Sequence, residues 1–336
     1  VDMAEEVKKL KQAGVTGIIV DLRRNGGGSL GDVVDIAGLF VGKGPVVQVK
    51  SNHASPSVLR AQPGDSILYS GPLAIMVNGG SASASEILAA ALQDYKRAVI
   101  VGSLTYGKGT VQKMVDLDQM IDPMTRVLMK NDTDGSMGQS IGALKLTMEK
   151  FYRVNGGSTQ LKGVKPDIAI PDDYEMYEDD DIGERHNKSA LAWDEIPPAN
   201  YKATGSVSNL NQLSQLSESR IKSNPTFRQI QENSEFYKRK KENNKVVLTE
   251  EQFRKDQEEM TAHSKKLEEL LKKNPLLELS NPPADMGKVT ADSVAITKNK
   301  DWLKNLSKDC YLSETVNIVN DMIKSGMKVN MGTGMK

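Results

Sequence analysis

Apolar residues in the first half of the chain recur with the periods of helices and of buried strands in turn. Residues 3–13 have helical periodicity and end at Gly14, a residue typical of helix C-termini. Residues 16–22 form a short buried-type strand before a glycine triplet, and residues 30–41 have the apolar spacing of a helix. The same patterns predict a helix at 83–95 and strands at 46–49, 73–77, 98–101, 111–117 and 143–154.

Strands that alternate with helices favour a largely parallel sheet covered by helices, so we expect an α/β fold for residues 1–171. The composition changes after Pro171, where eight acidic residues lie between Asp172 and Glu184 with few apolar ones. This run is typical of a solvated linker rather than a metal site, and we assign it to residues 172–204. The polar, helical pattern that follows predicts a separate α-helical domain over 205–336.

Composition and charge exclude several classes of function. The 44 basic residues balance the 44 acidic ones, and aromatic residues make up 5% of the chain, so neither nucleic acid nor a membrane surface is an expected partner. The single cysteine, Cys310, excludes an internal disulfide and a cysteine-based zinc site. No apolar run reaches the length of about 18 residues that a membrane span needs. The chain opens directly on an amphipathic helix, so we interpret it as an excised fragment, and the missing targeting segment carries no information.

The candidate chemistry lies in Asn78-Gly-Gly-Ser-Ala-Ser-Ala-Ser-Glu86 and in Thr105-Tyr-Gly-Lys-Gly109. Ser83 and Glu86 have the spacing of an ordinary helix-capping pair, which alone gives little reason to expect catalysis. The two glycines before Ser83 and its small neighbours nevertheless leave its hydroxyl accessible at a helix N-terminus. A serine nucleophile needs a base, and the nearby candidate is Lys108 rather than a histidine.

Backbone N–H groups for an oxyanion are available from two places. The amide of Ala84 lies at the predicted helix N-terminus beside Ser83. A second donor is expected from Gly27 or Gly28, in a turn that follows a strand of the same sheet. Because ligands of open parallel sheets bind at the carboxyl ends of strands, these groups should converge with Ser83.

Lys108 must be neutral to accept a proton, so its pKa must fall by about 3 units from its reference value, which burial can achieve. A carboxylate partner would oppose this change. We therefore expect Glu86 to turn back toward the helix end, and Gln112 to orient the amine without adding charge.

Other catalytic schemes fit poorly. His53, His186 and His263 are not placed as the base of a Ser-His-Asp triad. The segment that begins at Asp132 has the start of a calcium loop, but the required acidic residue is replaced by Ala143. A phosphate-binding GxxxxGK[ST] motif is also missing from the sequence.

The sequence resembles the carboxy-terminal processing, or tail-specific, proteases over residues 1–171. The resemblance rests on Asp21-Leu-Arg-x-Asn-x-Gly-Gly28, Ser81-Ala-Ser-Ala-Ser-Glu86, Thr105-x-Gly-Lys-Gly109 and Phe151-Tyr-Arg-x-Asn-Gly-Gly157 with Pro166-Asp-Ile. The helical part, with Leu312-x-Glu-Thr-Val-Asn317, is similar to the extension of the longer periplasmic members.

This resemblance implies a crotonase/Clp-protease-like core that needs no metal or cofactor. It implies Ser83 as nucleophile, Lys108 as general base, Gln112 as the residue that positions the lysine, and supporting roles for Glu86 and Thr105. It also implies an oxyanion hole from Gly27 or Gly28 with Ala84. The expected substrates are exported proteins cleaved near accessible C-termini, in the periplasm or outside the cell, and the helical domain is a candidate surface for an adaptor.

Two departures from the family pattern stand out. Members usually carry Gly-Glu before the lysine motif, where this chain has Gly102-Ser103, so any pairing by that glutamate is lost. The family's PDZ module, which reads the substrate's C-terminus, is expected in the full-length chain but is not found here. Two rival hypotheses are a non-catalytic scaffold and a crotonase-type acyl-CoA enzyme. The Ser-Lys-Gln set argues against the first, and the lack of a basic phosphate-binding cluster argues against the second.

Overall fold

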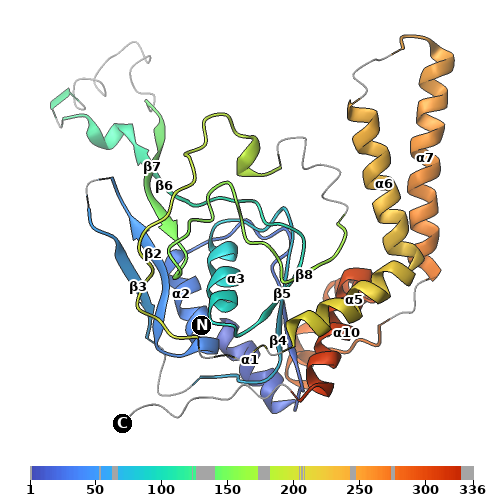
Figure 1. Cartoon of the computed structure of the whole chain (residues 1–336), viewed down its shortest axis with the longest axis horizontal. Coiled ribbons are helices and arrows are strands. Elements are labelled where there is room, and N and C mark those ends of the chain that lie inside the picture. Colours follow the sequence, from blue (N-terminus) through green and yellow to red (C-terminus); the bar gives the residue numbers. More distant parts are fainter. Residues whose placement is uncertain are drawn as a thin grey trace.

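The fold combines two β-sheets with helices that lie between and beside them (Figure 1). It is known from a computed structural model that describes residues 2–52, 54–62, 67–122, 124–125, 141–172, 182–203, 205, 207, 209–242, 247–273 and 277–326.

The first sheet is parallel and contains the strands that the sequence predicts around residues 18, 75 and 100. Its order is β1-β4-β5-β8, and every neighbouring pair is parallel. All five residues of β4 are buried, as expected for a strand covered on both faces. The parallel α/β core is thereby confirmed. Its strands are β1 (Ile18–Asp21), β4 (Leu73–Val77), β5 (Val99–Gly102) and β8 (Ile168–Ala169).

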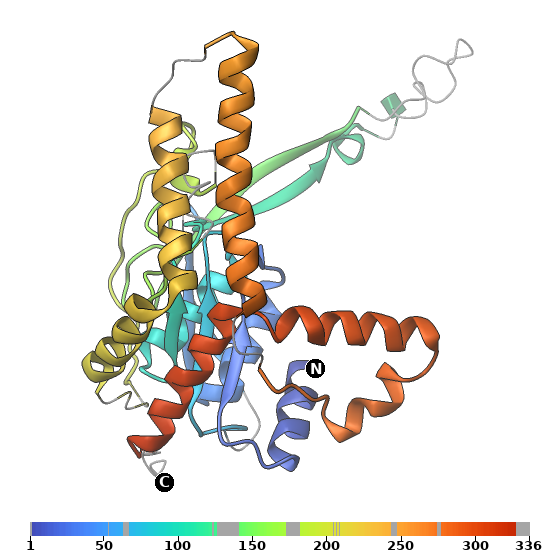
Figure 2. The ribbon, with the colours of Figure 1, turned by 90° about the vertical axis from the view of Figure 1, so that its right-hand side faces the viewer.

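The second sheet is antiparallel, which differs from the expectation of one largely parallel sheet. Its order is β3-β2-β7-β6, so the predicted strand at 46–49 pairs with β3 and β7 rather than joining β1 and β4. The long hairpin of β6 and β7 extends away from the body of the molecule (Figures 1 and 2). The strands are β2 (Gly44–Lys50), β3 (Ser57–Ala61), β6 (Thr110–Asp116) and β7 (Ala143–Tyr152); a short 3-10 helix, η1 (Leu117–Met120), follows β6.

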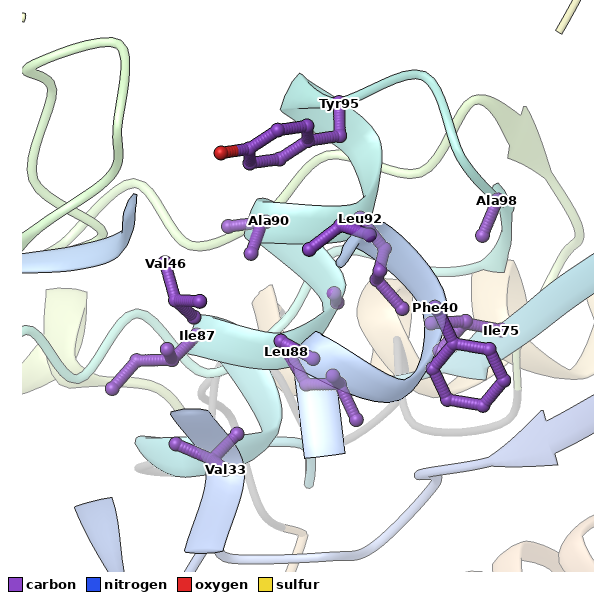
Figure 3. Packing of buried hydrophobic residues seen from close by; sticks show 14 of the residues in the cluster. Val33, Phe40, Val46, Ile75, Ile87, Leu88, Ala90, Leu92, Tyr95 and Ala98 are labelled. Carbon is purple, nitrogen blue, oxygen red and sulfur yellow. The ribbon is translucent and has the colours of Figure 1, made fainter. Parts of the chain in front are cut away.

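The main core lies between the sheets, where α2 (Leu30–Val41) packs against α3 (Ala84–Asp94), while α1 (Asp2–Gln12) precedes β1. Figure 3 shows buried side chains from both central helices, among them Val33 and Leu88, gathered in one cluster. Both helices match their predicted ranges closely. This packing fixes the N-terminus of α3 beside the carboxyl end of β4, an inner strand of the parallel sheet.

The opposite face of the parallel sheet is covered by the C-terminal helices. Successive residues of β5 alternate between the two cores: Ile100 belongs to the main cluster, whereas Val99 and Val101 contact the helical side. There they share a cluster with Ile318 and Met322 of the last helix. The helical region and the sheet therefore share one hydrophobic cluster. The division into domains at 171 and 205 stays a prediction.

The helical region contains α5 (Leu210–Ser223), α6 (Pro225–Glu242), α7 (Glu250–Lys273), α8 (Met286–Val289), α9 (Ser293–Leu306) and α10 (Cys310–Lys324), with short 3-10 helices η3 (Glu184–His186) and η4 (Pro283–Asp285). Helices α6 and α7 form a projecting pair (Figures 1 and 2). Among the described helices, none is both long and apolar enough to cross a membrane.

Most of the acidic run, residues 173–181, lies outside the described residues, but both of its ends contact the core. Asp172 is buried and accepts a hydrogen bond of 2.8 Å from the Ser103 hydroxyl. A carboxylate therefore lies beside position 103, although this chain has serine there instead of the family's usual glutamate. At the other end, the backbone N–H of Glu184 donates to the carbonyl of Tyr106, and farther along the backbone N–H of Ile196 donates to the carbonyl of Gly156. The described residues 182–203 therefore dock on the core instead of being solvated throughout.

Asp309 joins the helical region to the carboxyl end of β1. Its Oδ1 accepts from the backbone N–H of Leu312 at 2.9 Å and caps α10, while its Oδ2 lies 2.6 Å from Arg23 Nη2. We expect Asp309→Ala to lower the free energy of unfolding by about 1–2 kcal/mol, the larger part from the lost cap. Asp309→Asn retains the cap and should lose less. Denaturant unfolding of the two variants measures this, and equal losses would contradict the larger share given to the cap.

Candidate active site

Ser83 lies in the turn between β4 and α3, at the carboxyl end of the parallel sheet. Its backbone angles are φ 56° and ψ −115°. Ordinary N-cap residues adopt extended angles, and a positive φ is unfavourable for a residue with a Cβ atom. The position is therefore strained, which costs on the order of 1–3 kcal/mol and is characteristic of functional turns. Helix capping alone does not account for this conformation.

Glu86 connects the serine turn to the lysine turn. Its side chain is fully buried and accepts from the backbone N–H groups of Ser83, Gly107 and Lys108 at 2.9, 2.7 and 2.9 Å. It also accepts from the Thr105 hydroxyl at 2.5 Å. Burial raises the pKa of Glu86 to about 7, and these hydrogen bonds oppose the increase because all the partners donate. Glu86 does bond the helix end at Ser83, as expected, but its other three donors lie in the lysine turn; its contact with Lys108 is to the backbone N–H and not to the amine.

Lys108 lies between β5 and β6 in the glycine-flanked turn. Its Nζ donates to the carbonyl of Thr110 at 2.8 Å. Burial lowers the pKa of Lys108 from its ordinary value, in the direction that a neutral general base requires. Among nearby charges, Glu184 and Glu86 raise this pKa and Lys145 lowers it. The amine is therefore partly desolvated in a setting of mixed charge.

Ser83 and Lys108 line the same cleft, which has a volume of about 300 Å³. Gln112 lines it too, but the side-chain amide of Gln112 donates to the Thr147 hydroxyl at 3.4 Å rather than to Lys108. The remaining walls are mostly apolar. The cleft is lined by Gly28, Leu30, Ser83, Ala84, Ile87, Lys108, Thr110, Val111, Gln112, Lys145 and Phe151. It brings together a hydroxyl, an amine and space for an apolar side chain.

The glycine turn after β1 lies directly against Ser83. Gly27 has φ 98°, and a Cβ there would be 2.7 Å from the backbone nitrogen of Ala84 and 2.8 Å from the Cβ of Ser83. The N–H of Gly27 donates to the side chain of Asn25 at 2.9 Å, whereas Gly28 and Ala84 line the cleft. The two predicted sources of oxyanion donors are therefore adjacent, and the N–H of Gly27 is already engaged within its own turn.

Several residues that hold this arrangement were missed by the sequence analysis. The carbonyl of Asn25 accepts from the N–H of Ala82 and the hydroxyl of Ser85, at 3.0 and 2.9 Å. The Asn78 side chain accepts from the N–H groups of Arg24 and Gly80 at 2.9 and 3.1 Å. Both asparagines directly precede glycines, which is the signal of an Asx turn that could have identified them.

A larger cavity of about 610 Å³ lies between the carboxyl ends of β1 and β4 and the helical region. Its polar walls are dominated by paired charges, such as Arg23 with Asp309 and Lys272 with Glu268. Among the described residues that line it there is no serine, so it is not the candidate catalytic site. Within the described residues, no cluster of histidine, cysteine or acidic side chains is arranged to hold a metal ion.

Comparison with known proteins matches two family models to consecutive parts of the chain. The model of peptidase family S41 matches residues 1–170, and the model of the C-terminal domain of tail specific protease matches residues 177–324. The tail-specific protease of Haemophilus influenzae is 42% identical over 238 residues, which cover 68% of this chain and 31% of that protein. The carboxy-terminal-processing protease of Bartonella bacilliformis is 35% identical over 168 residues, 48% of this chain and 33% of that one.

Among solved structures, the photosystem II D1 C-terminal processing protease is similar with 32% sequence identity and a TM-score of 0.40, over 50% of this chain and 38% of that one. The chain spans about a third of the length of the curated relatives named above. Because the first family model matches half of the chain, it decides the assignment. The chain belongs to peptidase family S41.

Proposed function

We propose that this chain is the catalytic part of a serine endopeptidase that cleaves proteins near their C-termini through an acyl-enzyme. The observation that carries the proposal is that Ser83, in a strained turn at a helix N-terminus, shares a cleft with the partly desolvated Lys108. Membership of peptidase family S41 supports peptide or protein substrates.

In the proposed reaction, Lys108 Nζ removes the proton from the Ser83 hydroxyl while Oγ attacks the carbonyl carbon of the scissile peptide bond. The negative charge on the carbonyl oxygen is stabilised by the backbone N–H groups of Gly28 and Ala84, with Gly27 fixing the turn. Collapse of the intermediate transfers a proton from Lys108 to the leaving amine. Water then gives a proton to Lys108 as it attacks the ester carbonyl; the acyl group leaves as a carboxylic acid, and Lys108 returns the proton to Ser83 Oγ.

Glu86 and Thr105 support this chemistry by holding the two turns together. Since Glu86 bonds the backbones of Ser83 and Lys108, it fixes the spacing of nucleophile and base without forming an ion pair with the amine. Gln112 is proposed to hold the neutral amine when substrate occupies the cleft, by accepting an N–H of Lys108 on its side-chain oxygen while its side-chain nitrogen donates to Thr147.

The complete protein is proposed to act on exported proteins in the periplasm or outside the cell. A PDZ module elsewhere in the full-length protein would bind the substrate's C-terminus, and the helical region would recruit an adaptor. The proposed division is a core at 1–171, a linker at 172–204 and the helical domain at 205–336.

A fluorophosphonate probe tests the nucleophile directly. We expect covalent labelling of Ser83, loss of labelling in Ser83→Ala, and unchanged labelling when the exposed Ser219 of α5 is replaced by alanine. Mass spectrometry of the labelled peptide locates the probe. A folded protein, as judged by circular dichroism, whose label persists in Ser83→Ala would refute the proposal.

A further inference from the structure

The short helix η3 lies against the turn that carries Lys108. The backbone N–H of Glu184 donates to the carbonyl of Tyr106 at 2.9 Å, and Arg185 Nη2 donates to the carbonyl of Thr105 at 3.0 Å. Both acceptors are backbone groups within three residues of Lys108. This segment belongs to the predicted linker, and its contacts with the lysine turn were not foreseen.

A second connection runs through Gln160, which is completely buried. Its Oε1 accepts from the backbone N–H of Gly109 at 2.8 Å, and its Nε2 donates to Glu184 Oε1 at 3.2 Å. The neighbouring N–H of Leu161 donates to the carbonyl of Gly107 at 2.8 Å. The residues on both sides of Lys108 are thus held by one loop, and that loop is in turn bonded to Glu184.

The fit between these segments is close. A Cβ on Gly109 would lie 2.6 Å from the backbone nitrogen of Gln160, and one on Gly183 would lie 3.2 Å from Arg185 Nη1. Gly183 also has φ 120°, a conformation that favours glycine. A side chain at Gly109 would force the backbone of Gln160 to move, whereas at Gly183 it is the backbone conformation that favours glycine.

The charges that face Lys108 come from three elements: Glu184 on η3, Glu86 on α3 and Lys145 on β7. Glu86 is bonded to four donors, and Lys145 carries charge of the same sign as a protonated Lys108. Glu184 is therefore the acidic group whose removal changes the charge near the amine without breaking the link between Ser83 and Lys108.

We propose that Glu184 is a positioning residue for the catalytic lysine: through Gln160 it holds the Gly107–Gly109 turn. Its carboxylate is also one of the charges that face the amine, and there it favours the protonated form. The inference rests on the proposed function and adds a way to regulate it. Since η3 continues into the segment that leads to the helical region, movement of that segment would change both the position and the proton affinity of Lys108.

The test compares Glu184→Gln with Glu195→Gln, an exposed glutamate of the same segment that is not among the charges facing Lys108. Glutamine at 184 retains an oxygen for Gln160 but loses the charge. We expect the acidic limb of the kcat/KM profile to move down by about 0.5 pH unit in Glu184→Gln, with the high-pH plateau retained, and not to move in Glu195→Gln. Glu184→Ala, which also loses the acceptor, should lower kcat on the order of tenfold at unchanged KM.

A direct measurement separates this inference from the proposed function. In lysine labelled with 13C at Cε, the Lys108 resonance is the one missing from Lys108→Arg, and its titration gives the pKa of the amine without any cleavage. If the pKa of Lys108 is lower in Glu184→Gln but not in Glu195→Gln, the inference is supported, whether or not any variant cleaves a peptide. If the wild type cleaves no peptide, the proposed peptidase function is refuted and the inference about Glu184 is not. Equal pKa values in the wild type, Glu184→Gln and Glu195→Gln would overturn the inference.

Discussion

Lys108→Arg should reduce peptide cleavage on the order of 1,000-fold, as far as Lys108→Ala does. Arginine retains the positive charge and is at least as long as lysine, but its guanidinium cannot lose a proton in a protein and so cannot act as a base. Neither variant should unfold the protein, since Lys108 is only half-buried and its amine donates to the carbonyl of Thr110, on the surface of the cleft. Cleavage of a peptide with a free apolar C-terminus, with circular dichroism as control, measures the effect.

The same lysine predicts how cleavage depends on pH. Burial lowers the pKa of Lys108, so the neutral amine becomes populated at lower pH than for a free lysine, and activity should rise with pH through that pKa. Lys108→Arg should show no such rise. Substantial activity in the arginine variant, or a flat wild-type profile from about pH 5 to 9, would rule out a titrating lysine base.

Gly27→Ala should abolish most activity and destabilise the glycine turn. The new Cβ would be 2.7 Å from both the Ala82 carbonyl oxygen and the Ala84 nitrogen, and φ is 98°. Backbone must move, which costs more than about 1 kcal/mol and displaces the oxyanion donors. A displacement of about 1 Å lowers activity on the order of 100-fold.

Gly26→Ala is the matched control, because nothing lies within 4 Å of a Cβ at that position. Its activity and unfolding midpoint should stay close to those of the wild type. Equal losses in the two variants would mean that general stiffening of the turn, rather than the contact with Ser83 and Ala84, limits activity.

The elements that the sequence predicted best are those with a strong local signal. Helix α2 has continuous apolar spacing and an N-cap at Ser29, and its observed range, Leu30–Val41, is the predicted one. Strands β4 and β5 are short apolar runs in a regular alternation with helices. The serine and lysine motifs were located for the same reason, since each is contiguous in sequence.

The features that were missed depend on contacts between distant segments. Strand β2 pairs with β7, about a hundred residues later, and nothing local distinguishes it from a strand of the parallel sheet. Strand β8 has only two residues, too few for a period to be recognised. Likewise, the sequence assigns Glu184 to an acidic linker, because its hydrogen bond with Gln160 joins residues 24 positions apart and has no local signal.

The positive φ of Ser83 has a consequence for how substitutions at this position would be selected. A glycine at 83 would adopt the same backbone angles without the steric penalty of a Cβ atom, so a screen for thermal stability alone would favour the loss of the serine. A screen for activity would keep it. The residue at position 83 thus reports which property a population of variants has been selected for, because fitness for folding and fitness for chemistry are in conflict there.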